Sequence, residues 1–228
     1  MNLIKTKQGF TWTPVNIEEK LEQLLRAIER TRSNTPENNT RLLNKINRWR
    51  SQIEEIATRI QYIRDELAPD LEKILDLKIR NKEFLLTAMF QPSTKNLFLE
   101  IAAEYKREDD PIGADDFEHL VSLSEAAKVI ALLGDAAVSM AVLYHLWQPN
   151  VVDVGKLTQS KADIVSNENM ANLCDQWGLY EHRIHFDPAV PSKSEIDHDK
   201  GTLVEAIYGI IQMEHGFQGV MKTVDHLF

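Results

Sequence analysis

Residues 129–143 read VIALLGDAAVSMAVL, a stretch long enough for a helix in which Asp135 is the single charged residue. A second stretch, residues 203–211, reads LVEAIYGII and carries Glu205 in the same way. Runs this apolar are expected in a core, where an ionised carboxylate is rarely tolerated unless it is paired or bound to a metal. Two such acids on separate helices can meet across a packed interface and bind a hard cation through oxygen atoms. The pattern therefore indicates metal-assisted hydrolysis.

The bulk composition indicates a protein with a substantial core. The chain has 228 residues and a hydrophobic content of 43%, which suits one domain or one domain with an appendage. Its one cysteine, Cys174, excludes an intramolecular disulfide and suits a reducing cytosol, so we expect a cytoplasmic protein. No cleavable signal pattern opens the chain, and no charge-free run approaches the ~20 residues of a membrane span. We therefore expect no membrane segment.

The net charge of −9 is unevenly distributed along the chain. Residues 1–65 hold 12 Lys/Arg and 8 Asp/Glu, so this part is mildly basic at +4, while the remainder is distinctly acidic at −13. An acidic body argues against binding of nucleic acid by charge alone. It is compatible with a body that attracts metal cations.

Helical patterns dominate, and we predict an all-α fold. Apolar residues recur at spacings of four and three over residues 17–28 and again over residues 42–67, which is the spacing of a coiled-coil seam. Between them, residues 33–39 (SNTPENN) have the composition of a turn. We therefore predict a long antiparallel, coiled-coil-like helical hairpin over residues 16–67.

Ala68-Pro69-Asp70 is predicted to break this helical pattern. The chain is accordingly divided into a mildly basic N-terminal hairpin, residues 1–67, and a globular domain, residues 68–228. Within the second part, residues 106–118 and 182–199 are predicted to be loops.

The hairpin has two possible roles. A basic helix face is usually only solvated, which favours a structural arm or a prop for a dimer. The alternative is an arm that binds RNA through its basic side chains, which are Lys45, Arg48, Arg50, Arg59 and Arg64.

Four segments of the globular part, in this order, resemble the catalytic domain of the ribonuclease III family. Residues 71–88 are similar to its first helices, and LLGDAA at residues 132–137 resembles its Leu-Gly-Asp-Ala helix. GKLT, VSNENMA and WGL within residues 155–179 resemble its Val-Ser-Asn segment, and KGTLVEAIYG at residues 200–209 resembles its closing Glu-Ala helix. In the Val-Ser-Asn segment, Ser166 or Asn167 can cap the following helix, and Gly178 can close it. The resemblance implies a ribonuclease III-like helical domain after the hairpin.

The departures from the family pattern concern its acidic residues. The fuller family site has a Glu four residues before the aspartate and an Asp three residues before the glutamate, where this chain has Ala131 and Thr202. A further acidic position, seven residues before Asp135, is Lys128. One carboxylate is thus kept on each helix. This reduced set resembles the Mini-III subgroup, which also lacks a double-stranded RNA-binding domain, and we expect none in this chain.

The resemblance implies a metal-dependent endoribonuclease that cleaves double-stranded RNA as a homodimer formed through the helix of Asp135. Asp135 and Glu205 would be the catalytic metal ligands for Mg²⁺, with Mn²⁺ able to substitute, and Asn167 and Thr202 would support them. The alternative is a catalytically degenerate scaffold of the same fold that binds RNA or a ribonucleoprotein without cutting. A third interpretation, a helical adaptor that works through its hairpin, predicts no affinity for RNA.

Overall fold

The computed structural model describes residues 15–105, 113–147, 153–186 and 191–228. The regular secondary structure of this part is helical, apart from one isolated bridge between Phe90 and Ile184. The prediction of an all-α fold is confirmed. The elements are α1 (Ile17–Asn34), α2 (Thr40–Tyr62), the π-helical η1 (Ile63–Leu67), α3 (Ala68–Leu75), α4 (Lys82–Met89), α5 (Thr94–Tyr105), α6 (Ala114–Leu146), α7 (Val154–Ile164), α8 (Asn167–Gln176), the 3₁₀ turn η2 (Tyr180–His182), α9 (Lys193–Thr223) and the 3₁₀ turn η3 (Val224–Leu227).

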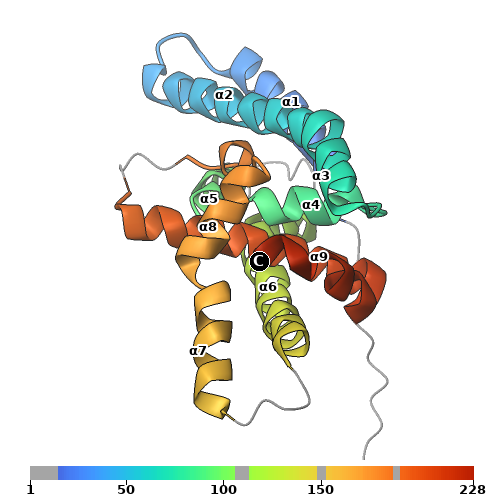
Figure 1. The fold of residues 1–228 in the computed structure, drawn as a ribbon. Coiled ribbons are helices and arrows are strands. Elements are labelled where there is room, and N and C mark those ends of the chain that lie inside the picture. Colours follow the sequence, from blue (N-terminus) through green and yellow to red (C-terminus); the bar gives the residue numbers. More distant parts are fainter. Residues whose placement is uncertain (1–14, 106–112, 148–152, 187–190) are drawn as a thin grey trace, which may run out of the picture.

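Helices α1 and α2 form an antiparallel pair that lies across one end of the molecule (Figure 1). Residues at the predicted seam positions of both helices are fully buried, including Leu24 and Ile28 in α1 and Trp49 and Ile53 in α2. These residues belong to the same continuous core as the rest of the protein. The helical pair is therefore packed onto the body rather than held away from it.

The predicted break at Ala68-Pro69-Asp70 is wrong, because helix continues from α2 through η1 into α3. Pro69 occupies the first turn of α3, where its missing N–H is tolerated. The wider π turn directly before it, in which the Ala68 N–H bonds to the Ile63 carbonyl, accommodates the proline ring. Covalent continuity and a common core thus join the hairpin to the body.

Two predicted loops are partly helical. Helix α6 begins at Ala114, so residues 114–118 are helix, whereas residues 106–112 lie outside the described part. Helix α9 begins at Lys193 because Ser192 and Glu195 form a reciprocal capping box, in which the Ser192 hydroxyl accepts from the Glu195 N–H and the Glu195 carboxylate accepts from the Ser192 N–H. The predicted caps of α8 are confirmed: Ser166 accepts a hydrogen bond from the Asn169 N–H, and Gly178 has φ +62°.

Helix α6 is the central element of the body, with α4, α5 and α9 packed against it and α8 packed against α9. Helix α7 has no buried residue and projects beside the lower part of α6 (Figure 1). By length and composition alone, the Asp116–Leu146 part of α6 could cross a membrane, a property that buried core helices share.

Candidate active site

The site is built where α9 crosses α6, at two glycines that let the helix backbones touch. A Cβ atom on Gly134 would overlap the carbonyl oxygen of Glu205 and lie 2.6 Å from the Gly209 nitrogen. A Cβ atom on Gly209 would overlap the carbonyl oxygen of Ile130. The crossing therefore requires glycine at both positions, because any side chain would force the helices apart.

This crossing brings the two predicted catalytic acids together. Asp135 follows Gly134 directly, and Glu205 is the residue whose backbone Gly134 contacts. Burial raises the pKa of Glu205 to about 7, and the negative charge of Asp135 adds to this effect. Glu205 is half-buried, but Asp135 is exposed, so the expectation that both acids lie in the core is wrong for Asp135. The carboxylate pair is therefore accessible to solvent on the Asp135 side.

Neither carboxylate has a hydrogen-bonding or ion-pairing partner among the described side chains. Two neighbouring negative charges without a cation are unfavourable, so the charge of Asp135 adds to the burial that raises the pKa of Glu205. Oxygen ligands of this kind suit Mg²⁺, which keeps several of its waters and needs only one or two carboxylates. The pair therefore fits a hydrated divalent ion, although no group of three or more His, Cys, Asp or Glu side chains in the described residues could form a fuller site.

The positions around the pair show why the acidic set is small. Ala131, one turn before Asp135, is 3% exposed and is packed in the core. The Thr202 hydroxyl donates to the His198 carbonyl 3.0 Å away and thus bonds to its own helix. Asn167, at the start of α8, has its Oδ1 atom 3.4 Å from where a Cβ of Gly201 would lie, one turn before Glu205. Thr202 and Asn167 thus border the site on α9 and α8.

Four of the five basic residues predicted for an RNA-binding arm lie on α2, where each pairs with a carboxylate. The ion pairs are Lys45 with Glu104 (3.2 Å) and Glu100 (3.6 Å), Arg48 with Glu100, Arg50 with Glu29 (2.7 Å) and Glu54 (2.8 Å), and Arg59 with Glu55 (3.0 Å). Arg64, in η1, pairs in the same way with Glu18 (2.6 Å) and Asp65 (3.0 Å). Because Glu100 and Glu104 belong to α5, two of these cations fasten the hairpin to the body.

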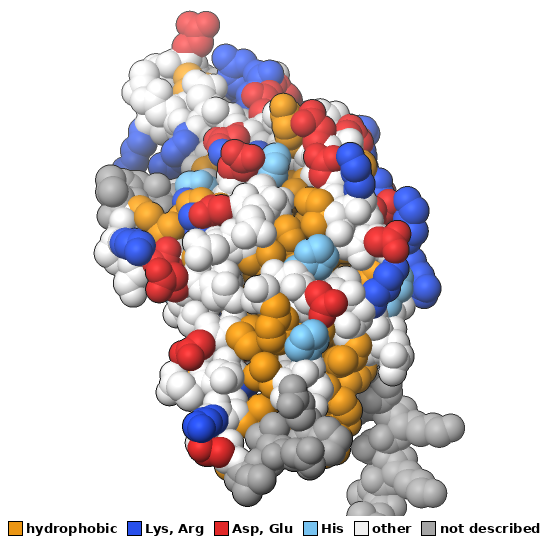
Figure 2. Space-filling model, viewed as in Figure 1, with side chains coloured by type: hydrophobic (Ala, Val, Ile, Leu, Met, Phe, Trp, Pro, Cys, Tyr) orange, Lys and Arg blue, Asp and Glu red, His pale blue; other side chains and the backbone are white. Residues whose placement is uncertain are grey.

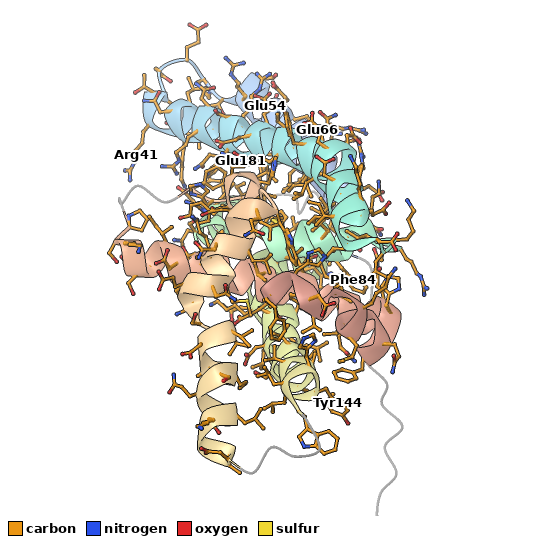
Figure 3. The ribbon with its side chains drawn as sticks, in the orientation of Figure 1. Arg41, Glu54, Glu66, Phe84, Tyr144 and Glu181 are labelled. Carbon is orange, nitrogen blue, oxygen red and sulfur yellow. The ribbon has the colours of Figure 1, made fainter. Side chains whose placement is uncertain are left out.

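Arg59 fastens the hairpin at a second point. Its guanidinium donates to the carbonyls of Glu181 and Arg183, next to η2, at 3.3 and 3.0 Å. Figure 3 shows Glu181 close to α2, on the side of the hairpin that faces the body. These contacts favour the structural role of the hairpin over the RNA-binding one.

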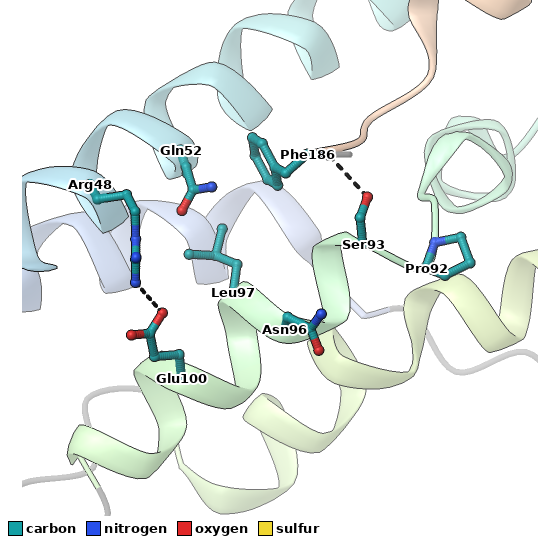
Figure 4. A pocket seen from close by; sticks show the side chains of 8 residues that line it. All are labelled: Arg48, Gln52, Pro92, Ser93, Asn96, Leu97, Glu100 and Phe186. Atoms are coloured by element: carbon teal, nitrogen blue, oxygen red, sulfur yellow. Dashed lines mark hydrogen bonds and ion pairs between the residues drawn. The ribbon is translucent and has the colours of Figure 1, made fainter. Parts of the chain in front are cut away.

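A cavity of about 440 Å³ opens between α2 and the start of α5. Its walls include Gln52, Asn96 and Phe186 together with the Arg48–Glu100 ion pair (Figure 4). Neither Asp135 nor Glu205 lines it, so this cavity is separate from the carboxylate site.

Sequence reasoning found the two acids but overlooked what holds them together. The signal was a single glycine inside each apolar run, Gly134 and Gly209, which marks a close approach of two backbones. The fold and the site together define an all-α protein with a paired-carboxylate centre.

Residues 128–216 match the family model for the ribonuclease III domain. The matched residues include Asp135, Glu205 and the crossing glycines. In general, this family comprises endoribonucleases that act on double-stranded RNA with divalent metal ions and that typically dimerise. No curated protein matches the chain.

Proposed function

We propose that this protein is a metal-dependent endoribonuclease that cleaves double-stranded RNA by phosphodiester hydrolysis and acts in cytoplasmic RNA processing. The observation that carries the proposal is the meeting of Asp135 and Glu205 at the α6–α9 crossing, without a cationic side chain between them and inside the matched domain. A divalent ion bound between the two carboxylates would relieve their mutual repulsion.

Asp135 and Glu205 would hold Mg²⁺, with Mn²⁺ able to substitute. A divalent ion bound there supplies an acidified water for attack on the phosphodiester and neutralises charge on the phosphate. Asp135, being exposed, is accessible to a duplex substrate. Glu205 must lose its proton to act as a ligand, and its pKa of about 7 makes that loss incomplete at neutral pH without metal. The chain's own residues thus favour activity on the alkaline side of neutrality.

The exposed face of α6 supports the homodimer in this proposal. Large apolar residues are exposed along one side of the helix and directly after its end. They are Val129, Leu132, Met140 and Leu143 on α6, and Trp147 at its C-cap. Figure 2 shows hydrophobic side chains gathered in the lower part of the molecule, where α6 ends. An apolar stripe of this length is typical of a protein interface. A second copy packed on it would bring two carboxylate sites onto one composite surface.

The alternative, a scaffold that binds RNA without cutting it, is favoured by one observation. Each site helix supplies a single carboxylate, and Ala131 and Thr202 stand where further acids would be needed for a fuller metal set. Two protein ligands predict weak metal affinity. Cleavage at high concentrations of Mg²⁺ or Mn²⁺ would therefore distinguish the nuclease from the scaffold, which would not cut at any concentration.

The experiment is to incubate the purified protein with duplex RNA, with and without Mg²⁺ or Mn²⁺, and to resolve the products on a gel. We expect cleavage that requires the metal and that is abolished by Asp135→Asn and by Glu205→Gln. Glu118→Gln, which changes an exposed acid on the same helix α6, is the matched control and should cut like the parent. Binding without metal-dependent cutting would establish the scaffold instead, and neither binding nor cutting would exclude both functions.

A further inference from the structure

Lys128 lies on α6 seven residues before Asp135. Seven residues are two helical turns, about 10 Å along the axis and about 20° around it, so the two side chains lie on the same face. The Lys128 side chain is 54% exposed. It therefore stands beside the carboxylate site at the edge of the exposed face of α6.

The ammonium group of Lys128 is only weakly engaged. Its ion-pair partner is Glu125, one turn earlier on the same helix, at 3.0 Å, and both side chains are more than half exposed. Exposed pairs of this kind contribute little to stability, because solvent screens both charges. Lys128 is thus free to bind a phosphate.

The other lysines near the site on α6 and α9 either pair with a carboxylate or lie on another face of their helix. Helix α6 contains no other Lys or Arg between Ala114 and Leu146. On α9, Lys200 is tied to Asp175 of α8 at 2.6 Å. Lys193 is twelve residues before Glu205, about 120° around the helix, and lies 3.9 Å from Asp197. On the described faces of α6 and α9 that carry Asp135 and Glu205, Lys128 is accordingly the one available positive charge.

A polyanion that approaches this site needs such a charge. The chain after residue 65 carries a net charge of −13, and the site itself presents two carboxylates, so a phosphate backbone is repelled until positive charge compensates. The axial separation of about 10 Å between Lys128 and Asp135 is one that a few consecutive phosphates of one strand span. A lysine contacts phosphate as a point charge and reads no sequence.

We propose that Lys128 binds a backbone phosphate of duplex RNA a few nucleotides from the bond to be cut and so holds the scissile phosphate over Asp135 and Glu205. This inference rests on the proposed function. Lys128 is a positioning residue that takes no part in the chemical step. Removal of the Lys128 side chain should weaken RNA binding and should make the binding less dependent on salt. The metal requirement of cleavage should stay the same.

The test measures binding of duplex RNA by Lys128→Ala, Lys128→Arg and the control Lys193→Ala, all in a Glu205→Gln background, over a series of salt concentrations. Loss of one phosphate contact should weaken binding by ~3–10-fold and lower the slope of log K against log [salt] by about one. Lys128→Arg should keep both values, and Lys193→Ala should match its parent. Because Lys128 is exposed, its variants should unfold at the same urea concentration as the parent.

Cleavage by the same lysine variants with Glu205 intact completes the test. We expect Lys128→Ala to raise KM at an unchanged kcat and an unchanged Mg²⁺ requirement. If the parent cuts duplex RNA while Lys128→Ala binds with unaltered affinity and salt slope, the role of Lys128 is excluded and the proposed function stands. If the parent neither binds nor cuts duplex RNA, both are excluded.

Discussion

Gly134 of α6 lies against the backbone of Glu205 in α9, so closely that no side chain fits between them. Asp135 is the next residue after this contact, and the Glu205 side chain begins at the contact itself. The backbones that carry the two carboxylates are therefore held at a fixed separation by direct contact. Such a rigid base is what a metal site with only two protein ligands requires.

Gly134→Ala should destabilise the protein and inactivate it together. The added methyl group would overlap the Glu205 carbonyl and force α6 and α9 apart. Overpacking of this kind costs about 1–3 kcal/mol of unfolding free energy. We expect a lower urea midpoint and, under conditions where the variant is still folded, loss of RNA cleavage.

Gly201→Ala is the matched control for this variant. Gly201 also lies inside α9, but a Cβ there would meet its nearest neighbour, the Asn167 Oδ1 atom, at an ordinary 3.4 Å. Alanine in place of a helical glycine should leave the stability equal or raise it by up to ~1 kcal/mol. Equal stability of Gly134→Ala and Gly201→Ala would contradict the backbone contact at the crossing.

The pKa of Glu205 predicts how stability depends on pH in the absence of metal. Burial and the charge of Asp135 raise this pKa from 4.5 to about 7, so the folded state disfavours the ionised form. The stabilisation is fully present below pH 4.5, where the acid is protonated in both states, and is lost as pH rises through 7. Relative to Glu205→Gln, the parent should therefore lose stability across this window.

We expect the parent to lose roughly 1–2 kcal/mol of unfolding free energy relative to Glu205→Gln. This is less than the shift in pKa would give at about 1.36 kcal/mol for each unit, because solvent screens a half-buried group. Urea unfolding in the presence of a chelator at several values between pH 4.5 and 8 measures this loss. Glu168→Gln, at an exposed acid on α8, should follow the parent at every pH. A constant difference between the parent and Glu205→Gln over the whole range would contradict the raised pKa.

Divalent metal should reverse this loss. An ion that binds only the folded state stabilises it by RT ln(1 + [L]/Kd), which is ~2.7 kcal/mol when the concentration is 100 times Kd. At pH 8 we expect millimolar Mn²⁺ or Mg²⁺ to raise the melting temperature of the parent, but not that of Asp135→Asn or Glu205→Gln. Equal shifts in all three proteins would place the ion elsewhere.

The sequence predicts those parts of the fold in which local spacing and packing agree. The seam residues Leu24, Ile28, Trp49 and Ile53 are all fully buried, because alternate spacings of three and four define one face of a helix. The caps at Ser166 and Gly178 were equally predictable, since each satisfies backbone groups at a helix end locally.

The rest depended on tertiary context. Residues 129–143 are apolar on almost every side, so their spacing does not indicate which arc faces the core, and Asp135 lies on the exposed arc. Pro69 stays within a helix because a π turn precedes it, and local sequence gives no sign of that turn. The Ser192–Glu195 capping box lies in a polar segment whose composition is typical of a loop, so the start of α9 was not predicted.

The apolar stripe on α6 predicts the effect of one surface substitution. Met140 and Leu99 are both 45% exposed, but Met140 belongs to the stripe on α6 whereas Leu99 is on α5. An aspartate at residue 140 would place a charge in the interface between two copies, so Met140→Asp should dissociate the dimer and Leu99→Asp should not. Sedimentation velocity at micromolar concentrations distinguishes them. A parent that is monomeric under these conditions would contradict the dimer.

The ion pair between Lys20 of α1 and Asp116 of α6 should contribute to the stability of the fold, independently of the carboxylate site. The ammonium of Lys20 is 2.9 Å from Asp116, and its side chain is almost fully buried while that of Asp116 is 38% exposed. Asp116→Asn would leave a buried positive charge without its partner. We expect a cost of about 1–2 kcal/mol, less than the ~3–5 kcal/mol of a fully buried pair because water reaches the Asp116 side.

A double-mutant cycle isolates this pair. Lys20→Met should be nearly neutral, because the long apolar side chain fills the same space, and combining it with Asp116→Asn should remove most of the cost of the single change. Glu22→Gln, which breaks the exposed Arg26–Glu22 pair at 3.1 Å, should leave the urea midpoint unchanged. If Asp116→Asn is as neutral as Glu22→Gln, the Lys20 ammonium reaches solvent in the folded protein and the ion pair does not contribute to stability.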